Sequence, residues 1–120
     1  MHAAAAKGHL ELVRELLKRG ASVDLPSSVG GTALIGAAGY GHLSIVLVLL
    51  QHSAYPDLQA NNGITALMLS AINGHKACVQ ALLQANANPD LQIIDGTTAL
   101  MLSAINGHKA CVKALLRAKA

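Results

Sequence analysis

The 120-residue sequence contains no phenylalanine or tryptophan and only two tyrosines, although 52% of its residues are hydrophobic. Alanine supplies much of this apolar content, so the core must be built from small aliphatic side chains that lie close together. A β-sandwich depends on β-branched and aromatic residues, whereas closely packed helices do not. The composition therefore predicts one domain of tightly packed helices. High apolar content with only 12% charged residues excludes intrinsic disorder.

Charged and thiol groups are also scarce. The formal net charge is +3, and no charged residue lies between Leu25 and Pro56. A basic excess that is divided between the two ends of a chain is weak support for nucleic-acid binding, which needs a contiguous basic surface. The two cysteines, Cys78 and Cys111, are too few for a disulfide framework and favour a reducing compartment. We therefore expect no nucleic-acid partner and a cytoplasmic or nuclear location.

Long hydrophobic runs are absent as well. The 18 residues from 33 to 50 carry no formal charge, but Gly36, Gly39, Gly41 and His42 leave an apolar run of only eight residues. A membrane-spanning helix needs about 20 apolar residues. This stretch predicts two short buried helices and no membrane span. The first residues lack a basic region followed by a hydrophobic one, so no signal peptide is expected.

What the sequence does contain is a 33-residue repeat. Gly-His pairs begin at positions 8, 41, 74 and 107, Thr-Ala-Leu begins at 32, 65 and 98, and leucine pairs begin at 16, 49, 82 and 115. Residues 65–79 and 98–112 are identical. One such unit cannot bury its own leucines, whereas stacked units can. The repeat therefore predicts a solenoid in which each unit contacts only its neighbours.

The sequence of each repeat predicts two helices. Thr32, Thr65 and Thr98 are expected to cap the first helix, for example 66–73, and Gly74 to end it in the left-handed conformation. A second helix over about 76–84 places four apolar residues on one side, which are Ala77, Val79, Leu82 and Leu83. Residues 20, 53, 86 and 119 follow that helix as left-handed caps. The alanines at 37, 38, 71 and 104 are expected to let the helices approach closely.

These residues resemble the ankyrin repeat pattern of G-x-T-P-L-H, A-A, G-H, V-x-x-L-L and G-A at a 33-residue period. The resemblance implies an all-α ankyrin-repeat solenoid of stacked helix-turn-helix units with β-turn or hairpin loops. It covers one domain, 1–120, with repeats at 1–26, 27–59, 60–92 and 93–120, the first and last being partial. Alanine at 33, 66 and 99 replaces the family's proline, and Ile35, Met68 and Met101 replace its motif histidine.

The histidines and cysteines also permit a metal or catalytic hypothesis. His75 and Cys78, like His108 and Cys111, lie three residues apart, but stacked helices stand about 8–10 Å apart and do not bring four ligands to one zinc ion. We expect the histidines to bond the turns and the cysteines to fill inward helical positions. No catalytic motif is present, so the sequence predicts no enzyme, no cofactor and no metal. The basic stripe of Lys109, Lys113 and Arg117 is expected to solubilise the outer face.

The resemblance implies that a protein partner binds the concave surface formed by turn tips and first helices. Tyr40 is expected to anchor the partner within an apolar ladder formed by Ile64, Ile72, Ile94 and Ile105. Affinity is expected to concentrate near Tyr40, Ile72 and Ile105. The predicted binding residues are Val29, Gly31, Tyr40, Asn62, Ile64, Ile72, Asn73, Ile94, Asp95, Thr97, Ile105 and Asn106.

The predicted function is a non-catalytic protein–protein interaction module. Two alternatives stay open: a structural spacer within a longer ankyrin array, and an engineered ankyrin scaffold without a natural partner. The last repeat copies the apolar residues of the internal ones and has no polar cap, so self-association through uncapped ends is a further hypothesis.

Overall fold

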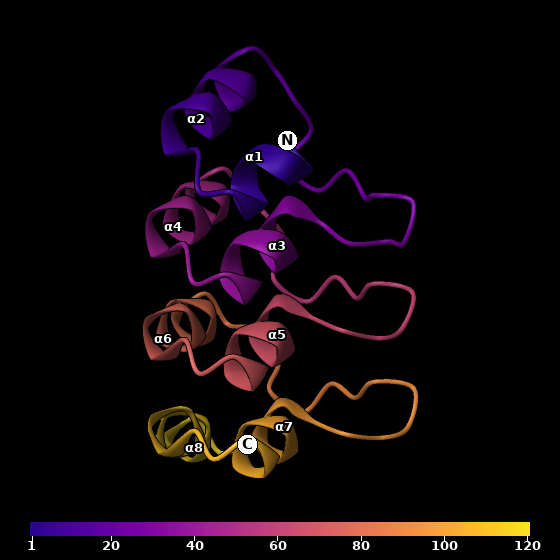
Figure 1. Cartoon of the computed structure of the whole chain (residues 1–120), viewed down its shortest axis with the longest axis vertical. Coiled ribbons are helices and arrows are strands. Elements are labelled where there is room, and N and C mark those ends of the chain that lie inside the picture. Colours follow the sequence, from indigo (N-terminus) through magenta and orange to yellow (C-terminus); the bar gives the residue numbers. More distant parts are fainter.

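The computed structural model describes all 120 residues and contains eight α-helices in four stacked pairs (Figure 1). The first helices of the pairs are α1 (His2–Ala6), α3 (Ala33–Gly39), α5 (Ala66–Ile72) and α7 (Ala99–Ile105). The second helices are α2 (Leu10–Lys18), α4 (Leu43–Gln51), α6 (Lys76–Gln84) and α8 (Lys109–Arg117). The two sets form adjacent columns, and loops project to one side (Figure 1). The all-α prediction is confirmed, because the chain contains no strand.

Threonine caps begin the first helices as predicted. The hydroxyl of Thr65 accepts a hydrogen bond from the backbone N–H of Met68 at 3.2 Å, and its backbone is extended. Thr32 and Thr98 cap α3 and α7 in the same way. These bonds satisfy N–H groups that would otherwise lack a partner at a helix start, which is buried at Thr32 and Thr65.

Left-handed residues end both helices of each unit. After α5, the N–H of His75 donates to the Ser70 carbonyl at 2.9 Å and the N–H of Gly74 to the Ala71 carbonyl at 3.3 Å. Gly74 itself has φ +75°, which glycine adopts without steric strain. The predicted caps after the second helices are also left-handed, and they include the non-glycine residues Ser53, Asn86 and Lys119.

The core fills the space between the two columns. Val79 and Leu82 of α6 are buried as predicted, and Leu83 is half-buried. Ala77 is exposed, so its predicted inward position is wrong; Cys78 and Ala81 take that side of the helix instead. The core contains no aromatic side chain and includes both cysteines.

The alanines of the first-helix column allow the close approach that was predicted, with one exception. Ala37, Ala38 and Ala71 are buried between neighbouring helices. Ala104 is exposed, because no further helix stacks on α7. The prediction for Ala104 is therefore wrong, although its sequence surroundings match those of Ala71.

A histidine joins each repeat to the one before it. The ring Nε2 of His75 donates to the Gly39 carbonyl at 3.1 Å, and that of His108 to the Ile72 carbonyl at 2.8 Å. Because a carbonyl only accepts, each ring carries its hydrogen on Nε2. Each ring also lies over the turn glycine of the preceding repeat. A Cβ on Gly74 would stand 2.6 Å from His108 Nδ1. The prediction that the histidines bond the turns is confirmed, and these bonds cross between repeats.

We expect Gly74→Ala to lower the free energy of unfolding more than Gly107→Ala does. Both glycines have positive φ, at +75° and +74°, so alanine carries the same backbone strain of about 1 kcal/mol at each. Only at Gly74 does a Cβ meet a histidine ring; nothing lies within 4 Å at Gly107. The displaced ring adds about 1–3 kcal/mol to the loss. Urea denaturation followed by far-UV circular dichroism measures both, and equal losses would contradict the ring contact.

Candidate protein-binding surface

The hairpin tips of successive repeats are held to one another by backbone hydrogen bonds. The Asn61 N–H donates to the Val29 carbonyl at 3.0 Å, and the Ile94 N–H donates to the Asn62 carbonyl at 3.4 Å. Each tip closes on a tight turn, for example with the Gly63 N–H donating to Ala60 at 2.8 Å. This agrees with the predicted β-turn loops. The tips therefore form a continuous row along the solenoid.

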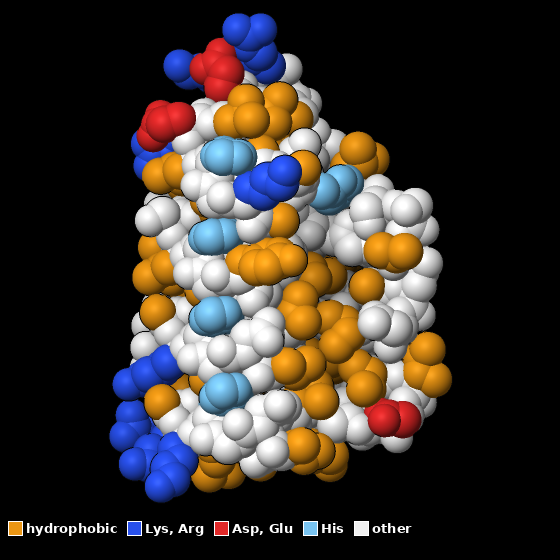
Figure 2. All heavy atoms as spheres, viewed as in Figure 1, with side chains coloured by type: hydrophobic (Ala, Val, Ile, Leu, Met, Phe, Trp, Pro, Cys, Tyr) orange, Lys and Arg blue, Asp and Glu red, His pale blue; other side chains and the backbone are white.

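Side chains add bonds between successive repeats. Gln59 Nε2 donates to the backbone carbonyl of Gln92 at 3.1 Å and joins two hairpins, and Asn73 Nδ2 donates to the Gly39 carbonyl at 2.8 Å and joins the ends of α5 and α3. Gly39 is buried, because Leu69 covers it: a Cβ there would lie 2.5 Å from Leu69 Cδ2. Figure 2 shows apolar side chains gathered between the first-helix column and the loops.

The structure divides the predicted binding residues into two groups. The exposed group contains four large apolar side chains, which are Val29 at 64%, Tyr40 at 68%, Ile94 at 83% and Ile105 at 77% of full exposure. It also contains Asn62, Asn73, Asp95 and Asn106. The half-buried group contains Gly31, Ile64, Ile72 and Thr97. Ile64 packs against the core, so only part of the apolar ladder faces solvent fully.

The ring of Tyr40 lies beside the histidine column. It stacks against His42 with ring centroids 6.2 Å apart and an interplanar angle of 25°. His42 in turn bonds the Ala6 carbonyl at 2.9 Å, so the ring beneath Tyr40 is fixed. This contact orients the tyrosine while most of its surface stays exposed, as suits an anchor residue.

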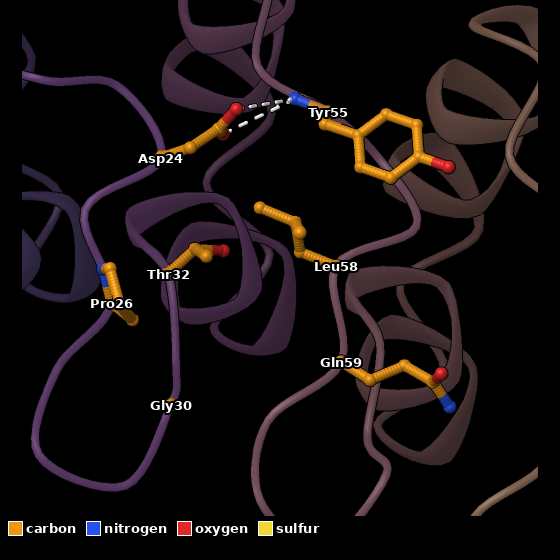
Figure 3. Close-up of a pocket in the computed structure, with 7 residues that line it drawn as sticks. All are labelled: Asp24, Pro26, Gly30, Thr32, Tyr55, Leu58 and Gln59. Carbon is orange, nitrogen blue, oxygen red and sulfur yellow. Dashed lines mark hydrogen bonds between the residues drawn. The ribbon is translucent and has the colours of Figure 1, made fainter.

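A depression between the first two hairpins has a structural explanation (Figure 3). Its residues are Asp24, Pro26, Gly30, Thr32, Tyr55, Leu58 and Gln59. Both carboxylate oxygens of Asp24 accept from the Tyr55 N–H at 3.2 Å, and the tyrosine ring points away from Asp24 (Figure 3). The same bond recurs one repeat later, where Asp57 accepts from the Asn88 N–H at 2.8 Å. Asp24 therefore joins two repeats.

Tyr55 is the exposed aromatic residue that the sequence analysis left out of the candidate surface. Its exposure is comparable to that of Tyr40. The repeat pattern gives no signal for it, because the equivalent residues are Ser22 and Asn88.

The basic stripe lies in a groove between α6 and α8. Lys109, Lys113 and Arg117 line it with Lys76 and Gln80. Lys and Arg side chains gather beside α8 and at the opposite end of the stack, with none along the middle (Figure 2). Both cysteines are free and buried, and no group of three potential metal ligands occurs. No helix of the chain has both the length and the apolar character of a membrane span.

Four stacked helix pairs with bonded loop tips define a helical repeat solenoid, a class of protein that presents an extended surface to partners. A family model described as ankyrin repeats (3 copies) matches residues 1–61 and 53–120. The chain therefore belongs to the ankyrin repeat family, as its sequence predicted. Members of this family are generally protein–protein interaction modules and are typically non-catalytic. No curated protein sequence matches the chain.

We expect both thiols to react slowly in the folded protein. Burial raises the pKa of Cys78, and burial likewise raises the pKa of Cys111, where the positive charge of Lys76 offsets part of the effect. Cys111 lies in α8, which packs on one neighbouring repeat only, so local opening should expose it first. In the variants Cys78→Ala and Cys111→Ala, the remaining thiol reports its own rate with an aromatic disulfide reagent. Faster labelling of Cys78 than of Cys111 would contradict this order.

A second prediction concerns the charge on the third hairpin tip. The Thr97 hydroxyl donates to Asp95 Oδ1 at 2.6 Å and the Thr97 N–H at 3.0 Å, and these bonds lower the Asp95 pKa below its ordinary value of 3.8. Because the pKa of Asp95 is lowered in the folded state, the ionised carboxylate stabilises the tip at pH values above the ordinary pKa. This stabilisation is lost as the pH falls through the folded-state pKa. Thr97→Val should raise the Asp95 pKa, whereas Thr97→Ser should keep it low. Carboxyl-carbon NMR titration measures both variants, and an unchanged pKa in Thr97→Val would rule out the hydroxyl as the main cause.

Proposed function

We propose that this chain is a non-catalytic binding module that holds a protein partner on its tip and first-helix surface. The observation that carries the proposal is the exposure of Tyr40, Ile94 and Ile105 on a surface whose hairpin tips are joined by backbone hydrogen bonds. Large apolar side chains in an exposed strip are typical of interaction sites, and aromatic residues are frequent anchors. We also propose a cytoplasmic or nuclear location, because two buried free thiols suit a reducing compartment.

The physical basis of such binding is the low cost of ordering the surface. The tips are already joined by the Asn61–Val29 and Ile94–Asn62 bonds, and Tyr40 already rests on His42. A partner therefore gains contacts without the entropy loss of ordering mobile loops on binding. The fixed negative charge of Asp95 beside Ile94 favours a partner with an apolar patch bordered by a basic group.

The experiment is a quantitative comparison of proteins captured from cytosolic and nuclear extracts. The surface variant is Tyr40→Ser with Ile94→Ser, which removes two exposed anchors. The matched control is Tyr55→Ser with Leu47→Ser, which removes an equally aromatic and an aliphatic exposed side chain outside the proposed surface. We expect partners captured by the parent to fall at least about tenfold with the surface variant, because anchor residues carry most of the binding energy. The control should retain them.

Circular dichroism must first show equal helical content in all three chains. Equal capture by parent and surface variant, or equal losses in surface and control variants, would overturn the proposal.

The second candidate is a structural spacer. The observation that favours it is the regularity of the stack: the histidine bond recurs at all three internal junctions, and the aspartate bond recurs at the first two, each in the same register. A spacer would give no partner that depends on Tyr40 and Ile94, so the same comparison separates the two candidates.

A further inference from the structure

One glutamine side chain bridges the second and third hairpins of the stack. Gln59 Nε2 donates to the Gly63 carbonyl of its own hairpin at 3.0 Å and to the Gln92 carbonyl of the next hairpin at 3.1 Å. A primary amide nitrogen carries two hydrogens, so this single nitrogen serves both acceptors. The carboxamide therefore fills the space between the two hairpins and pairs both carbonyls.

The first and second hairpins are joined in the same register as the second and third. The backbone bonds between their tips, and the aspartate bonds at their other ends, are related by a shift of 33 residues. The same shift relates the Gly63 and Gln92 carbonyls to those of Gly30 and Gln59. Two carbonyls of the first and second hairpins are therefore placed to accept a bridging amide.

The bridging side chain is missing at this junction. Pro26 stands where the later hairpins carry Gln59 and Gln92, and proline has no donor on its backbone or its side chain. No group of the chain donates to the Gly30 or Gln59 carbonyl. The Gln59 side chain itself points away from Pro26 and Gly30 (Figure 3). Two backbone acceptors are thus left without a protein partner.

The place of the missing carboxamide is a depression of about 530 Å³, which is lined by both Gly30 and Gln59. Ligand-binding pockets commonly measure about 300–1,000 Å³. Pro26, Leu58 and the exposed Tyr55 give the depression apolar walls. Aliphatic carbons can lie against these walls while a polar group reaches the carbonyls, so the depression has the size and chemistry to admit a side chain from another molecule.

We propose that this depression binds a glutamine side chain on an extended segment of a protein partner. The partner's carboxamide nitrogen donates to the Gly30 and Gln59 carbonyls, as the chain's own carboxamide does one repeat later. The glutamine methylenes lie against Pro26 and Leu58, and an apolar neighbour in the partner packs on Tyr55. The site therefore combines a pair of acceptors with an adjacent aromatic anchor.

The charges around the depression favour a neutral donor over an acidic side chain. A glutamate has the shape of glutamine, but when ionised it only accepts hydrogen bonds, so it would leave both carbonyls unpaired. The Asp24 carboxylate, which lines the depression, would also repel it. Asp24 already accepts the Tyr55 N–H at 3.2 Å. Since no cation lines the depression, nothing there offsets this repulsion.

The test is a two-dimensional NMR titration of the 120-residue chain with short peptides. The probe is acetylated Ala-Leu-Gln-Leu-Ala with a methylamide end, so its glutamine supplies the only primary carboxamide. We expect saturable shifts of the backbone signals of Gly30, Tyr55 and Gln59. The same peptide with glutamate should bind at least about tenfold more weakly. Equal binding of the two peptides, or no binding of the glutamine peptide at millimolar concentration, would overturn the proposal. A lysine peptide that binds more tightly would overturn the assignment to an amide.

A variant that fills the depression from within gives a sharper test. Pro26→Gln supplies the chain's own carboxamide to the two carbonyls, so it should weaken binding of the glutamine peptide at least about tenfold. Pro26→Ala, the matched control, removes the ring without supplying a donor and should keep most of the binding. Far-UV circular dichroism checks that both variants are as helical as the parent. Equal losses in the two variants would show that the proline ring, and not the free carbonyls, makes the site.

A gain of binding is expected where the existing bridge is removed. Gln59→Ala frees the carbonyls of Gly63 and Gln92, and Asn88→Tyr supplies the counterpart of Tyr55. The double variant should bind a second peptide, with new shifts at Gly63 and Gln92. A single unchanged site would contradict the role of the carbonyl pair.

This site goes beyond the proposed function and can fail separately from it. It uses none of the exposed residues Tyr40, Ile94 and Ile105. In the extract comparison, a protein held only in the depression would be lost with the Tyr55→Ser control and kept by the surface variant. A protein held on the proposed surface would show the opposite pattern.

Discussion

The stack depends on the absence of a side chain at one position of each repeat. The turn glycines at 8, 41 and 74 leave room for a histidine ring of the next repeat, and the left-handed backbone that ends each first helix favours the same residue. One small residue therefore ends a helix and receives the neighbouring repeat. The ring then fixes the spacing between repeats, because its Nε2 reaches a carbonyl near the end of the helix it covers. The aspartate and tip bonds follow that spacing in the loops.

Small residues also allow close packing in the core. The core has no phenylalanine or tryptophan, so neighbouring helices must approach closely to exclude water. Buried alanines between successive first helices allow this approach. Close packing of many short aliphatic chains gives dispersion contacts that compensate for the missing large side chains. The outer surface can then carry the few large apolar residues, such as Tyr40 and Ile94.

Local structure follows from the sequence almost residue by residue, because caps and left-handed turns are set by nearby residues. The threonine caps, the span of α6 and the turn at Gly74 were all predictable in this way. Burial was less so. Met68 and Met101 lie in identical 15-residue segments, yet one is buried and the other exposed, because burial depends on which repeat lies next. For the candidate surface, the position of a residue within the ankyrin repeat predicts whether it lies near the hairpin tips. It does not predict that Ile64 packs against the core while Ile94 is exposed to solvent.

The identical segments 65–79 and 98–112 also bear on how the chain folds. Each begins with the same threonine cap and contains the same histidine, so during folding both fit the face that α3 and α4 present. Chain connectivity favours the nearer one only slightly, since skipping a whole repeat lengthens the closing loop at a cost of about 1 kcal/mol. A structure that skips a repeat is therefore a competitive kinetic trap for this chain. The native order is more stable than this trapped structure. A skipped repeat leaves its leucines in water, whereas in the native stack they are buried against the repeats on either side.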